Sequence, residues 1–388
     1  MLELALQEQI LEKLNTLIVV LNTDGSVEYV SSAVNRMLGF RPDQLLGDNW
    51  WTKTRVNEPE AHKIKRILMG HISAGRQTTH IFENELRTAQ GGRKWIRWSV
   101  SFLNDDQVVG VGYDITDKKQ AEQRLLTAYN DLENKNKDIT DSIFYAQRIQ
   151  QSILPSLNFM KERDINSFVF YKPKDIVSGD YYWFYELNDK IYAAAVDCTG
   201  HGVPGAMMSM VASSILKEVF INKQLTDVAE ILTQLDIELC STINKKDAFE
   251  NNDGMDIGLV SFDRKTGILE FAGAFRPMLV SRRDGTLLEI SGSRYPIGFY
   301  SGITKQFEKH VIQTKPGDSI YLFTDGYVDQ FGGEFNKKLN RRHFKELVQS
   351  MQGMAMDEQE AFLEYAFNNW KQDNEQTDDI LVIGLQVK

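Results

Sequence analysis

The chain has 388 residues, of which 42% are hydrophobic and 25% charged, and its formal net charge at pH 7 is −10. This length allows two or three globular domains, and the acidic balance argues against a surface that binds nucleic-acid phosphates. Two cysteines exclude a disulfide framework and fit a reducing compartment. Neither an apolar stretch of membrane-spanning length nor a signal-peptide pattern occurs, so we expect a cytoplasmic protein that does not engage a membrane.

Residues 1–118 are predicted to form the first domain. Five segments have β-type patterns, at 16–22, 26–30, 78–87, 93–102 and 107–113. The first two flank a Thr-Asp-Gly turn, which predicts a hairpin. Helical patterns separate them from the last three, at 33–37, 43–46 and 58–70. Together with Leu38-Gly39-Phe40 and an Asp-Ile-Thr ending that begins at Asp114, this order resembles a PAS sensor domain.

The sequence leaves the signal of this domain open. A photoreactive flavin domain of the PAS type needs a cysteine beside the flavin, and residues 1–197 contain none. A haem would need an axial ligand such as His62, His71 or His80, although an exposed surface position is the simpler interpretation of each. A small-molecule pocket and an empty, packed core that serves dimerisation both remain.

Residues 119–154 are predicted to form a helical linker that ends before Pro155. Side chains at heptad spacing form one row, with Leu125, Leu132, Ile139, Ala146 and Ile153 at d positions and Tyr129, Asn136, Ile143 and Gln150 at a positions. This spacing predicts a coiled coil with a second copy, in which Asn136 favours a parallel pair in one register. The alternative is a single amphipathic helix that lies on a domain.

Residues 155–388 are predicted to form the third unit. Strand patterns occur at 167–172, 181–187, 190–196, 257–262, 268–273, 278–281, 287–290, 319–324 and 380–386. Helical patterns occur at 205–221, 227–243, 341–352 and 358–369. Runs of strands and runs of helices predict an α+β fold with antiparallel sheets flanked by helices.

Four aspartates of this unit stand beside β-type runs: Asp180, Asp197, Asp325 and Asp378. A carboxylate at a strand end lies at the rim of a sheet, where Mg²⁺ or Mn²⁺ accepts oxygen ligands. Two such ions can activate a shared water for in-line displacement at phosphorus. Any one of the four aspartates alone is better explained as a turn residue.

In their order along the chain, the motifs around these aspartates resemble the metal-dependent serine/threonine protein phosphatases of the PPM family, in the SpoIIE-like branch. They are Gly-Asp at 179–180, Asp-x-x-Gly-His-Gly at 197–202, Thr-Asp-Gly at 324–326 and Asp-Asp-Ile-Leu-Val-Ile at 378–383. The resemblance implies an α-β-β-α sandwich and two Mn²⁺ or Mg²⁺ ions held by the four aspartates. It also implies a further ligand, the backbone carbonyl of Cys198, where many relatives have glycine.

The chain departs from the family pattern in two places. Ala274 stands where many relatives have a histidine, and Asp256 adds an acid where they often have an aromatic residue. These departures leave the substrate contacts, and any third-metal role of Asp253 or Asp256, undetermined.

The glycines at 200–205 also match the spacing of a dinucleotide-binding turn. That motif requires an acid about twenty residues later at the tip of a second strand, whereas Glu218 lies in a helical pattern. We therefore interpret 200–205 as a loop that brings backbone close to metal and phosphate. His201 within it could orient a ligand or water, or could be a solvated loop residue.

Two other classes of phosphotransfer enzyme are excluded because each requires a residue that this sequence lacks at the necessary position. A cysteine phosphatase needs an arginine six residues after its nucleophile, but Pro204 follows Cys198 and Lys246 follows Cys240 at that distance. A histidine kinase needs a phosphoacceptor histidine on the linker helix, and the linker contains none.

The sequence thus predicts a PAS-regulated bacterial protein phosphatase that hydrolyses phosphoserine or phosphothreonine. By resemblance, its substrate would be a phosphorylated anti-sigma-factor antagonist of the STAS type, and a homodimer would form through the PAS domain and the coiled coil. The alternative from another class is a dimeric signalling scaffold that binds the phosphoprotein without cleaving it.

Overall fold

The computed structural model describes residues 16–55, 63, 65–66, 69–70, 79–243, 253–298 and 305–388. Most of the helix predicted at 58–70, with His62 and His71, lies outside these residues. The chain forms two compact units, Met1–Asn136 and Lys137–Lys388. No helix among the described residues is long and apolar enough to cross a membrane.

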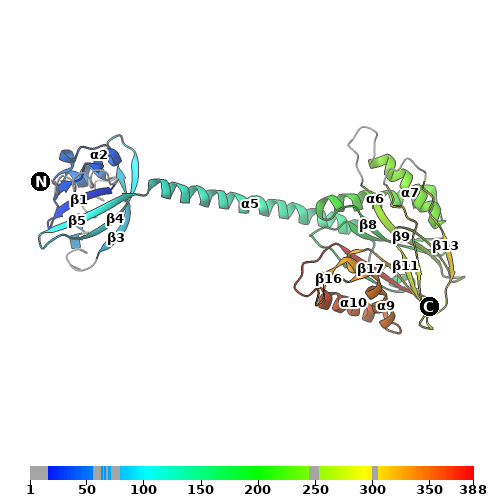
Figure 1. The fold of residues 1–388 in the computed structure, drawn as a ribbon. Coiled ribbons are helices and arrows are strands. Elements are labelled where there is room, and N and C mark those ends of the chain that lie inside the picture. Colours follow the sequence, from blue (N-terminus) through cyan, green and yellow to red (C-terminus); the bar gives the residue numbers. More distant parts are fainter. Residues whose placement is uncertain are drawn as a thin grey trace. The chain divides into compact units, whose positions relative to one another are not determined.

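The N-terminal unit is built on one antiparallel sheet with the strand order β2-β1-β5-β4-β3 (Figure 1). Its strands are β1 (Thr16–Asn22), β2 (Val27–Val30), β3 (His80–Arg87), β4 (Arg93–Phe102) and β5 (Gln107–Asp114). The short helices between them are α2 (Ala33–Leu38), η1 (Pro42–Leu45) and α3 (Asn49–Thr54), of which α3 was not predicted. This is the PAS arrangement that the sequence predicted, and His80 opens its edge strand β3.

Aliphatic side chains and three tryptophans form the core of this unit. Trp50 and Trp98 meet edge to face with ring centroids 5.9 Å apart. The recess beside them, which Val19 and Phe82 also line, holds about 20 Å³. That volume has room for little more than one water.

The linker is one helix, α5 (Thr116–Ile153), of 38 residues. It starts where β5 ends, because Asp114 accepts a hydrogen bond from the Thr116 amide and the Thr116 hydroxyl accepts one from the Trp95 amide. Its apolar row is exposed over the first part, with Leu125 and Leu132 about 70% accessible. Gln150, near its end, is buried.

The C-terminal unit contains two packed five-stranded antiparallel sheets, with the orders β13-β10-β9-β8-β7 and β12-β11-β14-β17-β6. The first contains β7 (Asp180–Leu187), β8 (Lys190–Cys198), β9 (Met255–Asp263), β10 (Ile268–Ala274) and β13 (His310–Gln313). The second contains β6 (Asn166–Lys172), β11 (Met278–Ser281), β12 (Leu287–Ile290), β14 (Ser319–Phe323) and β17 (Ile380–Gln386).

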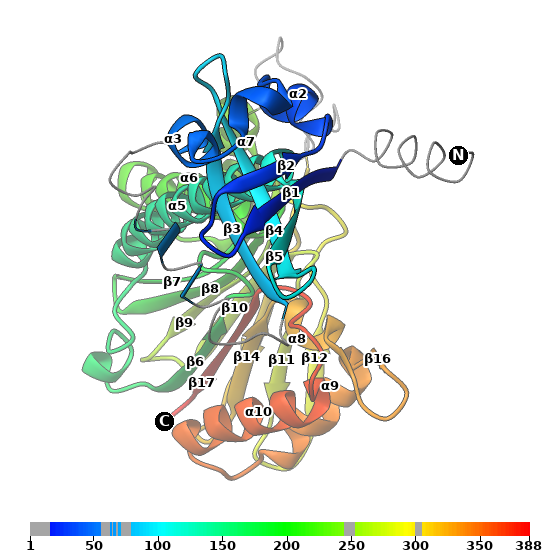
Figure 2. The ribbon, with the colours of Figure 1, turned by 90° about the vertical axis from the view of Figure 1, so that its left-hand side faces the viewer.

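Helices cover the outer face of each sheet, as Figure 2 shows. The first sheet carries α6 (Gly202–Lys223) and α7 (Val228–Ile243), and the second carries α8 (Gly326–Asp329), α9 (Asn340–Ser350) and α10 (Met356–Lys371). Three apolar layers result, one between the sheets and one beneath each set of helices. The predicted α-β-β-α sandwich is confirmed.

The structure of this unit differs from the prediction in several places. The edge strand β13 and the one-turn helix α8 were not predicted. Helix α6 begins at Gly202, so most of the segment interpreted as a loop at 200–205 is helical. Pro204 does not prevent this, because the first helical turn has no intrahelical acceptor for its amide groups.

Candidate metal centre

Side-chain alternation turns three aspartates of the first sheet into the space between the sheets. On β8, Ile191, Ala193 and Ala195 face the second sheet, and Asp197 has the same parity. Asp180 on β7 and Asp256 on β9 are its direct cross-strand partners. Three carboxylates therefore lie side by side across β7, β8 and β9 at one end of the sandwich.

The second sheet contributes the carboxylates of Asp325 and Asp378 at the same end. Asp325 follows β14, and Asp378 precedes β17, which pairs with β14. Gly326 permits this proximity, since a Cβ at that position would lie 1.9 Å from the Asp379 carbonyl oxygen. The glycine of Thr-Asp-Gly is thus required by close packing of the two aspartate segments.

The sheets are joined by hydrogen bonds at this end. The hydroxyl of Thr324 donates to Asp180 Oδ2 at 2.6 Å and accepts the Leu381 amide at 3.0 Å. Asp379 accepts the amides of Lys174 and Gly179, each at 2.8 Å, and so fixes the segment that leads into Asp180.

A guanidinium lies among the carboxylates. Nη2 of Arg276 is 2.6 Å from Asp197 Oδ2 and 2.8 Å from Asp325 Oδ2. The same nitrogen is 3.0 Å from Asp256 Oδ2. Within the described residues, no three acidic, histidine or cysteine side chains adopt an arrangement that could hold a metal ion. The carboxylates instead surround an organic cation.

Burial and mutual repulsion disfavour ionised carboxylates here. Burial, followed by the charge of Asp197, raises the pKa of Asp180 well above its ordinary value. Burial also raises the pKa of Asp197 to about 8, with Asp325 and Asp256 adding to the effect and Arg276 opposing it. Additional positive charge would relieve this repulsion. The oxygen-only donor set fits a hard divalent ion.

Cys198 and His201, which the sequence also singled out, have different surroundings. The Cys198 side chain lies in the apolar layer beneath α6 and α7, where burial raises its thiol pKa well above the ordinary value and disfavours a nucleophilic thiolate. Its carbonyl oxygen lies near Gly179, at the aspartate end. His201 is exposed, and its Nδ1 lies 2.9 Å from Asp175 Oδ2.

Sequence reasoning did not assign a site role to Gln150 on α5. Its side chain donates to the Ser178 carbonyl at 2.6 Å and to the Ser209 hydroxyl on α6 at 2.8 Å, and it accepts the Ser178 amide at 3.2 Å. Ser178 stands two residues before Asp180, so the linker helix is hydrogen-bonded to the segment that positions this aspartate. The heptad spacing of Gln150 gave no signal of this contact.

Main-chain segments around Asp180 and Asp197 pack without side chains between them. A Cβ on Gly205 would lie 2.1 Å from the Gly200 carbonyl oxygen, and one on Gly179 would lie 2.5 Å from the same atom. The glycines therefore let the start of α6, the loop after β8 and the start of β7 touch directly.

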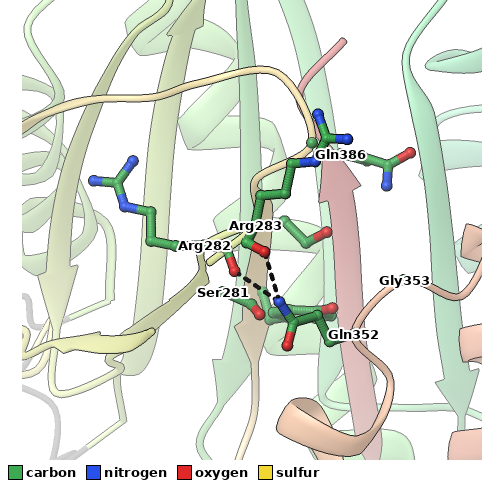
Figure 3. A pocket seen from close by; sticks show the side chains of 9 residues that line it. Ser281, Arg282, Arg283, Gln352, Gly353 and Gln386 are labelled. Carbon is green, nitrogen blue, oxygen red and sulfur yellow. Dashed lines mark hydrogen bonds between the residues drawn. The ribbon is translucent and has the colours of Figure 1, made fainter. Parts of the chain in front are cut away.

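A separate recess of about 240 Å³ lies at the opposite ends of β14 and β17 (Figure 3). Gln352 donates there to the carbonyls of Arg282 and Arg283, while Arg282 pairs with Asp318. No carboxylate belongs to the described lining, so this recess is not a metal-site candidate.

Comparison with known proteins identifies both units. The family described as Stage II sporulation protein E (SpoIIE) matches residues 188–388, and the PAS fold matches residues 11–120. The solved SiaA-PP2C domain of Pseudomonas aeruginosa is 31% identical, with a TM-score of 0.60. That match covers 66% of this chain and 99% of the domain.

Two further solved structures match at lower identity. The RsbU and RsbW domains of a Mycobacterium tuberculosis protein are 20% identical, over 57% of this chain and 60% of theirs, with a TM-score of 0.46. The SpoIIE phosphatase domain of Bacillus subtilis is 19% identical, over 57% of this chain and 90% of its own, with a TM-score of 0.39. No curated protein matches the chain.

Proposed function

The chain belongs to the SpoIIE family of PP2C-type protein serine/threonine phosphatases, and we propose that it dephosphorylates a STAS-type anti-sigma-factor antagonist under the control of its PAS domain. PP2C-type phosphatases depend on divalent metal ions. The observation that supports catalysis most directly is the convergence of five aspartates from both sheets at one end of the sandwich.

We propose two Mn²⁺ or Mg²⁺ ions in this cluster. Their carboxylate ligands would be Asp180, Asp197, Asp325 and Asp378, with the Cys198 carbonyl as a further ligand. When bound, such a pair lowers the pKa of a water and orients it for in-line attack on phosphorus. The oxygen donor set and the raised pKa values of Asp180 and Asp197 support this assignment.

Other side chains of the cluster would keep the ligands in place. The Thr324 hydroxyl donates to one oxygen of Asp180 and thereby fixes the orientation of that carboxylate. Asp379, whose oxygens accept two backbone amides, holds the preceding segment rather than facing a substrate. Asp325 is the most exposed of the carboxylates that contact Arg276, with 40% of its side chain accessible. We infer that the phosphorylated residue approaches from its side.

The substrate class rests on the resemblance of the motifs to the SpoIIE-like branch. Dephosphorylation of a STAS-type antagonist would trigger partner switching and release a sigma factor. The exposed apolar row on α5 supports the further proposal that the enzyme acts as a homodimer.

Hydrolysis of p-nitrophenyl phosphate by the full chain, measured with Mn²⁺ and with EDTA, tests the chemistry. We expect turnover that requires the metal. Release of phosphate from a phosphorylated STAS domain, against a phosphorylated unrelated protein, tests the substrate. A chain that binds the phosphorylated STAS domain but shows no metal-dependent turnover on either compound would be the scaffold instead.

A further inference from the structure

Arg276 is the one cation that the described residues place inside the aspartate cluster. Its side chain is only 9% accessible, and a single nitrogen, Nη2, serves three carboxylates. Asp197 and Asp256 belong to one sheet, while Asp325 follows a strand of the other. The guanidinium therefore links the two sheets at the candidate metal centre.

The backbone around Arg276 is tightly constrained. Phe275 has a φ of 56°, which is unfavourable for a bulky L-residue. Its amide donates to the Ser293 carbonyl at 2.8 Å. A Cβ at Gly273 or Gly292 would lie 2.3 Å or 2.6 Å from the Arg276 carbonyl oxygen. The turn after β10 thus holds the main chain in one position and directs the arginine inward.

The charge balance gives this side chain a role in the metal-free protein. Buried carboxylates without a counter-charge are strongly destabilising. Yet the guanidinium is not optimally satisfied, because its Nε is buried without a hydrogen-bond partner among the described residues. A forked, bidentate pair would have used more of its five donors. The cluster uses Arg276 as a point charge.

We propose that Arg276 is a built-in counter-ion that occupies the candidate metal centre and must leave the carboxylates when a divalent ion binds. The inference rests on the proposed metal role of Asp197 and Asp325. An ion held by both Oδ2 atoms, at the roughly 2.0–2.1 Å typical of Mg²⁺, would compete for the space that Nη2 fills. Positive charges would also repel one another there. The measured metal affinity then reflects the exchange of the Arg276 guanidinium for the divalent ion at these carboxylates.

Calorimetric titration of Mn²⁺ into the metal-stripped full chain tests this exchange. Arg276→Gln removes the competing charge, so it should bind Mn²⁺ about tenfold more tightly or better. Its metal-free form should melt at a lower temperature, and Mn²⁺ should raise that temperature more than in the unmodified chain. Arg276→Lys should resemble the unmodified chain, because the site uses one nitrogen. Arg282→Gln, at the opposite strand ends, is the matched control.

A second measurement does not depend on the folding of Arg276→Gln. The side-chain NMR signal of Arg276 in the unmodified chain, assigned by its loss in Arg276→Lys, should move as Mg²⁺ saturates the protein. The exchange is refuted if this signal stays fixed at saturation, or if folded Arg276→Gln binds Mn²⁺ with unchanged or weaker affinity. If the unmodified chain and Arg276→Gln both bind no metal, the proposed function fails together with the inference.

Discussion

Asp197 lies at the centre of the acidic row, between Asp180 and Asp256 on its two neighbouring strands. Asp197→Asn keeps the shape of the side chain but removes a charged oxygen. We therefore expect metal-dependent hydrolysis to fall by more than about 100-fold, beyond the loss typical of outer-shell partners. The melting temperature in EDTA should not fall. Rates at several Mn²⁺ concentrations, with a thermal melt of each variant, check both expectations.

Two variants serve as controls for that prediction. Asp189→Asn changes an exposed aspartate in the turn between β7 and β8, which pairs with Lys265 far along the strands from Asp197. Cys198→Ser keeps the backbone carbonyl and changes only a side chain in the helix-facing layer. Both should retain activity. Full activity of Asp197→Asn in EDTA would contradict metal-dependent chemistry.

The aspartates of the candidate centre could be predicted from sequence, whereas Arg276 could not. Each aspartate adjoins an apolar strand inside a motif, which is a local signal. Arg276 acts through Asp197 and Asp325, which are 79 and 49 residues away. Nothing in the residues around Arg276 encodes a contact that depends on how two sheets pack. Sequence showed only that the usual histidine was absent nearby.

The junction of β5 and α5 explains the Asp-Ile-Thr ending in physical terms. Burial would raise the pKa of Asp114, but hydrogen bonds from Lys94 and Thr116 outweigh it and hold the pKa below its ordinary value. This carboxylate therefore stabilises the fold above its unfolded-state pKa of about 3.9, and the contribution is lost as pH falls through the lower folded-state value.

Asp114→Asn should lower the stability of the PAS unit by about 1 kcal/mol at pH 7. The difference from the unmodified chain should shrink below pH 4. Urea unfolding followed by tryptophan fluorescence at pH 7, 5 and 3.5 measures it, because four of the six tryptophans belong to this unit. Asp106→Asn, in the loop before β5, is the control. If the difference in unfolding free energy between Asp114→Asn and the unmodified chain grew towards low pH, the stabilising role of the Asp114 carboxylate would be contradicted.

The end of α5 is the element through which the linker contacts the candidate centre. Gln150→Leu would leave the buried amide of Ser178 without its partner, at about 1–3 kcal/mol, while the Ser178 carbonyl would keep only the 3.3 Å hydrogen bond from the Ser209 hydroxyl. We expect about tenfold weaker apparent Mn²⁺ affinity, since Asp180 would lose its fixed neighbour. The exposed Gln151→Leu should change little. Equal Mn²⁺ dependence of the two variants would show that the contact does not support the centre.

The elements that sequence missed have weak or misleading local signals. β13 has four residues on a sheet edge, and alternate side chains are exposed, so its hydrophobic signal is weak. The four residues of α8 are too few to show a helical period. At the start of α6, Gly202 and Pro204 indicated a loop, although both are tolerated in a first helical turn. Long buried strands such as β8 were predicted to within one or two residues.

For the whole molecule, the exposed apolar row on α5 predicts a dimer. Leu132 and Ile139 are each at least 60% accessible. Gln150 in the same heptad row is instead buried and hydrogen-bonded to Ser178 of the catalytic unit. Light scattering of the full chain should therefore give twice the mass of one chain. Leu132→Asp with Ile139→Asp should shift it towards the monomer, while Asn134→Asp, off the row, should not. A monomeric unmodified chain at micromolar concentration would contradict the coiled coil.

The continuity of α5 supports a hypothesis about regulation. It runs without glycine or proline from Thr116 to Ile153, and Gln150 near its end contacts Ser178. A stiff helix transmits rotation, and each inserted residue turns the downstream part of the chain by about 100°. Inserting one or two residues at Asn134 should change basal activity strongly, while seven should largely restore it. Equal phosphatase rates for insertions of one, two, four and seven residues would reduce α5 to a tether.

Because the carboxylates of the candidate centre come from both sheets, ions bound there would also cross-link the two sheets of the sandwich. Ligand at about 100 times its dissociation constant stabilises a folded protein by about 2.7 kcal/mol. Proteases cleave transiently opened chains at a rate that follows the equilibrium population of the open form, and stabilisation by metal lowers this population. The abundance of this enzyme in a cell would then follow its supply of divalent metal, so that scarcity shortens its lifetime as well as stopping its chemistry.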